Sequence, residues 1–282
     1  MKRLVVTADD FGLAPEVNDA VEQAHIAGVL SAASLMVGAA ACSDAVARAR
    51  RLPNLRVGLH LVLVEGRPVA PPATIPDLVD AAGRLRTDLA AYGFAIATRP
   101  AARRQLRAEI HAQFEAFRAT GLVLDHVDAH QHYHLHPTIA SELLAIGREY
   151  GMKALRVPFE PRSSLRAVEP TPRSMATWLA APWAALLRTR ARRAGVLVAD
   201  RVFGLAWSGA MTEKRLAGLI AGLPDGRTEI YAHPATASSF PGSAEGYRYR
   251  DELAALTSPS CKEALRGSGA TLGGYGDFAG AD

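Results

Sequence analysis

Short apolar runs recur along the chain, and each is followed by a stretch of mixed polar and apolar residues. A short apolar run that is bounded by turn-forming residues is typical of a buried β-strand. These runs predict strands at Leu4–Ala8, Ala33–Val37, Arg56–Val64, Val123–Ala129, Ala154–Val157, Val202–Ala206, Thr228–Ala232 and Thr271–Gly274.

The segments between these runs carry a helical pattern. The first of them begins with Pro15 and ends with Gly28, which are favoured at a helix start and just past a helix end. The pattern predicts helices at Pro15–Gly28, Ser43–Arg51, Arg103–Thr120, Thr138–Gly151, Thr212–Gly222 and near Asp251–Leu265.

Strands that alternate with helices indicate an α/β fold built on a parallel sheet. About seven such units predict a distorted (β/α) barrel, closed or nearly closed, and a single domain over residues 1–282. Two segments depart from the alternation. Residues 65–100 are punctuated by Pro and Gly and predict a long connection of the kind that covers active sites. Residues 158–200 predict an inserted helical segment.

The composition excludes several classes of protein. Apolar residues make up 49% and charged residues 21% of the chain, which is the balance of a globular protein. There is no apolar stretch of membrane-spanning length and no signal-peptide pattern, so we expect a cytoplasmic protein. Cys42 and Cys261 are far apart and predict free thiols. A net charge of +4, without zinc-finger spacing, gives no reason to expect a nucleic-acid partner.

Carboxylates and histidines gather where the predicted strands end. Asp9 and Asp10 end the first strand, His60 lies in the third, His130 follows the fourth, and His233 follows Tyr231-Ala232. Two histidines and one carboxylate on separate strand ends form a metal site that keeps positions open for water and substrate. We therefore predict Asp10, His60 and His130 as ligands of one divalent metal ion.

The remaining groups suggest a metal-assisted hydrolase. Asp9 lies beside the predicted metal and can act as the general base, and His233 can protonate a leaving group. Arg156 can pair with Asp9 and hold it ionised. Zinc is favoured by two imidazole ligands, whereas magnesium prefers oxygen.

Each of these residues also has a plain structural explanation. Adjacent aspartates are common in turns, a histidine in a strand is often a hydrogen-bonded core residue, and an arginine often forms a surface ion pair. His134 and His136 can belong only to the turn before Pro137. All these explanations would have to hold at once at the strand ends, and we therefore favour the metal site.

Four motifs together resemble the YdjC-like carbohydrate deacetylases, in the same order and at similar spacing. They are Ala8-Asp9-Asp10-Phe11-Gly12, Gly58-Leu59-His60-Leu61, Asp128-Ala129-His130-Gln131-His132-Tyr133-His134 and Ala232-His233-Pro234-Ala235. The resemblance implies a single catalytic domain similar to the polysaccharide deacetylases, which removes acetyl from N-acetylated amino sugars with zinc or magnesium. It assigns the metal to Asp10, His60 and His130, the base to Asp9 and the acid to His233.

Three further residues are predicted to bind substrate: Phe11, His132 and His134. A backbone N–H near Phe11 or Gly12 is expected to stabilise the oxyanion of the reaction. Gln131 stands where the chitooligosaccharide deacetylases of this family tend to have a histidine. This difference leaves the predicted ligand set intact but speaks against a chitooligosaccharide substrate, which is therefore the alternative to a lipid-linked amino sugar.

The inserted segment suggests a lipid substrate. Its predicted helix carries a stripe of apolar residues followed by arginines, which suits a helix at a membrane surface; packing on the barrel with a solvated basic end is the alternative. The stripe consists of Met175, Trp178, Leu179, Pro182, Trp183, Leu186 and Leu187, and Arg188, Arg190, Arg192 and Arg193 follow.

The whole chain, including Val202–Gly209, resembles the hopanoid-biosynthesis-associated branch of the family. This resemblance implies an N-acetylglucosaminyl lipid as substrate and contact of residues 175–193 with the inner face of the membrane. A homodimer is a further expectation for the partners of this protein.

Two other classes of function remain open. A phosphoesterase on a similar barrel would need more clustered ligands for a two-metal site and a glycine loop for phosphate, for which Gly273-Gly274 is a candidate. A sugar-binding protein without activity would need neither Asp9 nor His233, so their presence favours an enzyme.

Overall fold

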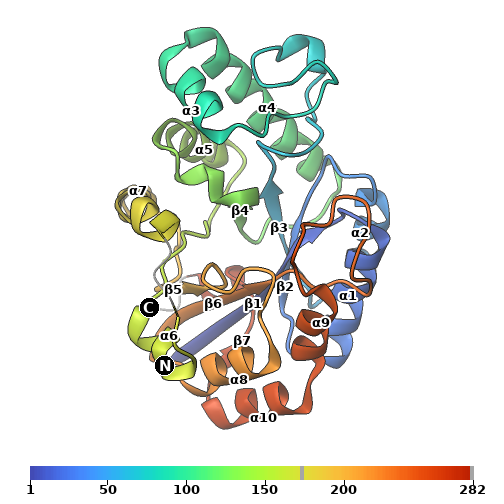
Figure 1. The fold of residues 1–282 in the computed structure, drawn as a ribbon, viewed down its shortest axis with the longest axis vertical. Coiled ribbons are helices and arrows are strands. Elements are labelled where there is room, and N and C mark those ends of the chain that lie inside the picture. The colour runs from blue at the N-terminus through green and yellow to red at the C-terminus, as the bar shows by residue number, and fades with distance from the viewer. Residues whose placement is uncertain (172–174, 280–282) are drawn as a thin grey trace.

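A parallel β-sheet forms the centre of the computed structural model, which describes residues 1–171 and 175–279 (Figure 1). The described residues contain seven strands, and the order across the sheet is β4-β3-β2-β1-β6-β5, with β7 paired to β1 beside it. All of these pairs are parallel. The strands are β1 (Lys2–Phe11), β2 (Ala32–Leu35), β3 (Arg56–Leu61), β4 (Val127–Ala129), β5 (Arg201–Phe203), β6 (Gly226–Ala232) and β7 (Thr271–Leu272).

The sheet curls so far that single bridges run between its two edges. Val127 of β4 bridges Leu155, Ala154 bridges Leu197, and Phe159 bridges Val202 of β5. The predicted α/β fold with a distorted, nearly closed barrel is confirmed as a curled half-barrel. The predicted strand Ala154–Val157 is wrong in detail, because this segment forms isolated bridges instead of a strand.

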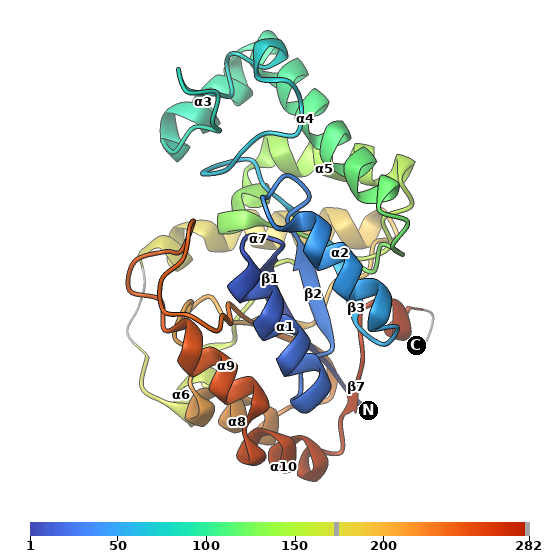
Figure 2. The same cartoon turned by 90° about the vertical axis from the view of Figure 1, so that its right-hand side faces the viewer.

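Helices cover the outer face of the lower part of the sheet, because strand β1 is buried from Leu4 to Phe11 and needs cover (Figures 1 and 2). They are α1 (Pro15–Ala27), α2 (Cys42–Arg51), α8 (Glu213–Ala221), α9 (Tyr249–Thr257) and α10 (Pro259–Ser268). A single helix was expected near Asp251–Leu265. Pro259 divides it, because the residue before a proline avoids the helical region, and Ser258 caps α10 through the N–H of Cys261.

The connection after β3 forms a separate helical lobe, at the top of Figure 1. It contains η1 (Pro72–Thr74), α3 (Leu89–Thr98) and α4 (Pro100–Ala119), and α5 (Pro137–Glu149) packs against α4. Two buried side chains of α4 hold the irregular part of the connection. Gln113 hydrogen bonds to both backbone groups of Val62, and Glu109 accepts the N–H groups of Val69 and Ala70. The long connection is therefore anchored by α4.

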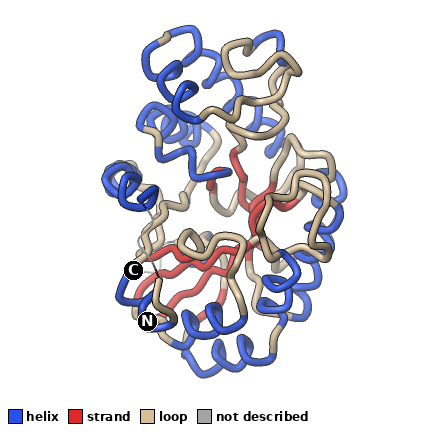
Figure 3. Tube along the Cα trace, viewed as in Figure 1, coloured by secondary structure: helices blue, strands red, loops and turns tan. Residues whose placement is uncertain are grey.

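The predicted helical insertion contains α6 (Arg162–Val168) and α7 (Met175–Arg193) before β5 (Figure 3). Helix α7 packs inward through Leu187 and Ala191, whereas Trp183 and Leu186 are exposed. The predicted apolar stripe therefore divides between two sides, and its residues Met175, Trp178 and Leu179 lie outside the side chains that the structure describes. Among the described residues, no helix has the length and apolarity that would carry it across a bilayer.

Candidate active site and metal centre

Asp9 and Asp10 lie at the carboxyl end of β1, where the strand leaves regular geometry. The register of β1 with β2 shifts between Ala8 and Phe11, and Asp10 has a φ of 62°. Successive side chains of a regular strand point to opposite faces. The irregular backbone lets both carboxylates reach the same buried cluster, and a positive φ at a non-glycine residue is a strain that recurs at functional sites.

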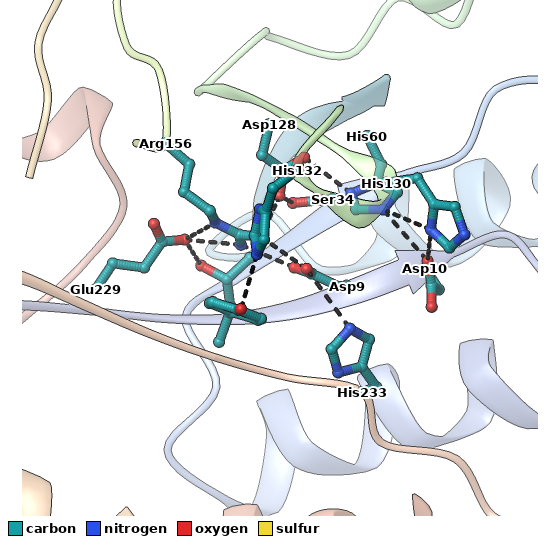
Figure 4. Close-up of polar contacts among 12 residues, drawn as sticks. Asp9, Asp10, Ser34, His60, Asp128, His130, His132, Arg156, Glu229 and His233 are labelled. Atoms are coloured by element: carbon teal, nitrogen blue, oxygen red, sulfur yellow. Dashed lines mark hydrogen bonds and ion pairs between the residues drawn. The ribbon is translucent and has the colours of Figure 1, made fainter. Parts of the chain in front are cut away.

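Asp10, His60 and His130 come together as the sequence predicts. Asp10 Oδ1 lies 3.3 Å from His60 Nε2 and 3.3 Å from His130 Nδ1, and the two nitrogens are 3.4 Å apart (Figure 4). Asp10 Oδ1 is buried and makes no hydrogen bond within the described part of the chain. Three ligand atoms about 2.1 Å from one ion, at near-tetrahedral angles, would be about 3.4 Å apart. The residues therefore fit a divalent metal ion.

The chain turns sharply after β4 to place His130. The short helix η2 (His130–Leu135) begins with Gln131 and His132 at φ values of 53° and 52°. Two consecutive left-handed residues other than glycine are strained, and such strain persists only where surrounding contacts hold it. The contacts are those of Gln131 with Glu65 and of His132 Nε2 with the Tyr231 hydroxyl at 2.8 Å.

Asp128 fixes the orientation of His60. Asp128 Oδ1 accepts a hydrogen bond from His60 Nδ1 at 2.9 Å, so the opposite nitrogen, Nε2, faces Asp10 and His130. Metal-bound histidines commonly have such a carboxylate partner. Burial would lower the pKa of His60, but Asp128 and Asp10 outweigh it and raise the pKa well above its usual value. The surroundings of His60 thus favour a positive charge, which a metal ion would supply.

Arg156 is fully buried and holds Asp9 with two hydrogen bonds. Its Nη1 donates to Asp9 Oδ2 at 2.6 Å and its Nη2 to Asp9 Oδ1 at 2.8 Å, so the predicted pair is present. Nη1 also lies 2.6 Å from Asp128 Oδ2, and Nη2 donates to Glu229 Oε1 at 2.9 Å. Burial would lower the pKa of Arg156, but these carboxylates raise it well above its usual value. A permanent cation thus compensates three buried carboxylates.

The sequence prediction did not include Glu229, the third of these carboxylates. Its Oε1 accepts from Thr7 Oγ1 at 2.7 Å and its Oε2 from the Tyr275 hydroxyl at 2.6 Å. The ring of Tyr231 lies 4.5 Å from the Arg156 guanidinium carbon and covers it. The signal for Glu229 was an acidic residue in the buried part of strand β6, next to Ile230, where a charge is rare unless it is paired.

His233 follows β6 and approaches Asp9 on the side away from Asp128 (Figure 4). Its Nε2 lies 3.9 Å from Asp9 Oδ2. Its Nδ1 is buried and has no hydrogen-bond partner among the described residues. The backbone N–H of His233 donates to buried Glu252, which fixes the start of the loop. Asp9 therefore lies between a fixed arginine and a histidine with an unused nitrogen.

The three predicted substrate-binding residues behave differently. Phe11 is fully buried in the core, and the N–H of Gly12 donates to Asn18 at 2.8 Å, so the Gly12 amide is already engaged and not free for a substrate oxyanion. His134 is also fully buried, and its Nε2 donates to the backbone oxygen of Arg156 at 2.9 Å. The structure thus gives His134 a contact that braces the backbone of Arg156, and the substrate contacts of Phe11 and His134 stay predictions. His132 is half-buried beside Tyr231 and Arg156, where substrate contact stays a prediction.

The sequence matches the family model for YdjC-like protein over residues 3–267. The chain belongs to the YdjC-like family. This assignment covers nearly the whole sheet and all the strand ends that carry the site. The motifs from which the resemblance was predicted therefore lie within the matched region.

This YdjC-like chain is similar to proteins named carbohydrate deacetylase. The human one is 33% identical over 301 residues, covering 96% of this chain and 89% of that protein. The one from Brevibacillus brevis is 39% identical over 148 residues, covering 52% of this chain and 56% of that protein. A crystal structure of an Enterococcus faecalis protein proposed to cleave cellobiose phosphate superposes with a TM-score of 0.76 and 25% identity, covering 99% of both chains.

Proposed function

We propose that this YdjC-like protein is a metal-dependent hydrolase that removes acetyl from an N-acetylated amino sugar. The observation that carries the proposal is the buried Asp10 Oδ1, which lies 3.3 Å from both His60 Nε2 and His130 Nδ1 and directly follows an Asp9 that Arg156 holds in place. Relatives named carbohydrate deacetylase, similar over most of this chain, support the same reaction.

The chain's own groups can move the protons that amide hydrolysis requires. A divalent ion held by Asp10, His60 and His130 would supply Lewis acidity, which polarises a carbonyl and acidifies water. Asp9 is placed to take a proton from the attacking water, because Arg156 fixes its orientation. His233, on the other side of Asp9, is placed to give a proton to the amine as the C–N bond breaks. The products are acetate and a free amino sugar.

The phosphoesterase alternative loses its two supports. A second group of possible ligands, Asp9, His60 and Asp128, exists beside the first, but the Arg156 guanidinium already lies 2.6 Å from both aspartates. The backbone N–H groups of the proposed phosphate loop, Gly273-Gly274, already make hydrogen bonds within the protein. The N–H of Gly273 donates to Leu4 O and that of Gly274 to Asp277, so these amides are not free to bind phosphate.

We propose further that the sugar is carried by a lipid of the N-acetylglucosaminyl hopanoid type. On α7, Trp183 is 47% and Leu186 44% exposed, although large apolar side chains of this kind are usually buried. Further along the same helix, Arg190 and Arg193 line a groove with Arg148 and other residues, and this positive charge is complementary to an anionic membrane surface.

Acetate release tests the reaction. Zinc-loaded protein would be incubated with an N-acetylglucosaminyl lipid, with N-acetylglucosamine oligosaccharides and with p-nitrophenyl phosphate. We expect acetate from the lipid and no phosphate from the ester. Acetate from the oligosaccharides alone would retain the deacetylase and reject the lipid. Release of phosphate alone would reject both.

Vesicle flotation tests the membrane contact separately. The double variant Trp183→Ser/Leu186→Ser should bind anionic vesicles about tenfold more weakly than the parent, because it loses the exposed apolar pair. Phe94→Ser/Val123→Ser is the matched control, since these side chains are 68% and 86% exposed elsewhere. Equal flotation of parent and both variants would contradict the contact.

A further inference from the structure

A chain of buried hydrogen bonds continues from His60 away from the metal ligands. Asp128 Oδ2 accepts from Ser34 Oγ at 2.8 Å, and Ser34 Oγ lies 3.0 Å from His126 Nε2. His126 Nδ1 lies 2.9 Å from Asp125 Oδ2. Ser34, His126 and Asp128 are fully buried. None of the functions assigned so far uses His126, although its ring lies only two side chains from a metal ligand.

The hydrogen-bond chain ends at the carboxylate of Asp125, which must accept every hydrogen bond that it makes. Asp125 Oδ1 accepts the N–H of Gly276 at 2.8 Å, and its Oδ2 accepts the N–H of Tyr275 at 3.1 Å. Burial would raise the pKa of Asp125, but His126 and these two N–H groups lower it below its usual value. An ionised carboxylate cannot donate. The contact at 2.9 Å therefore requires a proton on His126 Nδ1.

Asp128, at the other end of the hydrogen-bond chain, determines whether His126 Nε2 carries a proton. Asp128 is paired with Arg156 and His60 and acts as an acceptor, so the Ser34 hydroxyl must donate to it. A hydroxyl has one proton. Once that proton points to Asp128, Ser34 Oγ can only accept from His126. His126 Nε2 then also carries a proton, and the ring is an imidazolium.

The protein makes room for this ring. A Cβ at Gly58 would lie 2.6 Å from Cε1 and Nε2 of His126, so only glycine fits at this position. The Tyr275 ring is 5.3 Å from the ring of His126. The charged groups that face the imidazole are Asp125, Asp128 and Glu229, all negative, and they outweigh the effect of burial and raise its pKa. The glycine of the Gly58-Leu59-His60 motif is thereby explained.

We infer that His126 is a positioning residue of the metal centre. As a donor at both nitrogens it directs the Ser34 proton to Asp128, and Asp128 in turn holds His60 with Nε2 facing the metal. If His126 were neutral, Ser34 could donate to His126 instead, and Asp128 would lose one of the groups that orient it. The inference rests on the metal site of the proposed function, but it concerns a protonation state that can be measured without turnover.

Nitrogen-15 NMR of the histidine rings in zinc-loaded protein tests the protonation state. The signals of His126 would be assigned by their disappearance in His126→Gln. At pH 7 we expect both ring nitrogens to be protonated. A His126 ring with one unprotonated nitrogen would overturn the inference.

Zinc titration tests the positioning role. Ser34→Ala interrupts the chain without adding volume, and it should weaken zinc binding by about tenfold, at the lower end of the effect of removing a partner of a metal ligand. His126→Gln should weaken it similarly, and the double variant should be little worse than either alone, because both changes break one path. His25→Gln is the control, since His25 contacts only the backbone oxygen of Leu30 among the hydrogen bonds of the described chain.

The outcomes separate this inference from the proposed function. Unchanged zinc affinity in folded Ser34→Ala would overturn the positioning role, whatever the activity. A parent protein that binds zinc and shows a doubly protonated His126, but releases no acetate, would overturn the deacetylase and leave the positioning role standing.

Discussion

The two adjacent carboxylates of β1 have different partners: two histidines lie beside Asp10, and an arginine lies beside Asp9. Asp10 belongs to the metal half of the site with His60 and His130, and Asp9 belongs to the arginine half with Arg156 and Glu229. Asp9 has a permanent cation at 2.6 Å, whereas Asp10 Oδ1 is buried without a hydrogen bond within the described chain. Two neighbouring aspartates can therefore have different proposed roles, Asp10 as metal ligand and Asp9 as general base, because their surroundings differ although both are carboxylates.

Removal of the permanent cation should have the largest effect on stability. Arg156→Leu would remove the arginine cation that Asp9, Asp128 and Glu229 share, and these buried carboxylates would keep only their hydroxyl and histidine partners. We expect unfolding to become easier by about 3–5 kcal/mol, as for other broken buried ion pairs. Urea denaturation measures this change. Arg118→Leu, which removes an exposed arginine paired with Glu115, should leave the unfolding free energy nearly unchanged because solvent screens this pair. Equal effects of both variants would refute the comparison.

Acid should weaken the arginine half through His134, whose Nε2 binds the backbone of Arg156. Burial lowers the pKa of His134 to about 4, below the usual value of 6.5. A depressed histidine pKa gives stability that is complete above pH 6.5 and is lost as pH falls toward 4, since the unfolded state takes up the proton first. The loss is up to about 3 kcal/mol.

Denaturation curves between pH 7 and pH 4.5 measure this loss. His134→Gln has no titrating ring at this position, and its stability should depend less steeply on pH than that of the parent. An identical pH dependence in parent and variant would show that His134 is not the group responsible.

Metal addition should stabilise the metal half by a smaller amount. An ion that binds only the folded state contributes about 2.7 kcal/mol when its concentration is 100 times the dissociation constant. Thermal melting with and without zinc measures this gain. Asp10→Asn, which removes one charged ligand, should lose most of it. A gain of the same size in Asp10→Asn would place the ion elsewhere.

The sequence was sufficient for the parts of the site that lie at strand ends. Asp10, His60 and His130 stand directly at the ends of apolar runs, and parallel strands bring such ends together, so the close approach of these three side chains could be predicted. The pair of Arg156 with Asp9 was also predicted, and the structure contains it. The parallel sheet could also be predicted, because β1 and its neighbours β2 and β6 are buried apolar runs that alternate with helices.

Other features depended on three-dimensional packing. Glu229 and His126 are buried polar residues whose partners come mostly from distant parts of the chain, Thr7 and Tyr275 for Glu229 and Ser34 for His126, and the local sequence does not show these partners. Phe11 and His134 lie within the motifs, yet the irregular turns of the chain direct both into the core. The segment 154–157 is apolar enough for a strand, but at the open side of the half-barrel it forms isolated bridges only.

In the proposed mechanism, Asp10 binds the metal and Asp9 takes the proton from the attacking water. Zinc affinity and acetate release would be measured on the same preparations of Asp9→Asn and Asp10→Asn. Asp9→Asn should keep zinc affinity within a few-fold of the parent and release acetate about 10²–10⁴ times more slowly, as expected for a lost general base. Asp10→Asn should lose both. Normal acetate release by Asp9→Asn, or parental zinc affinity in Asp10→Asn, would contradict the account.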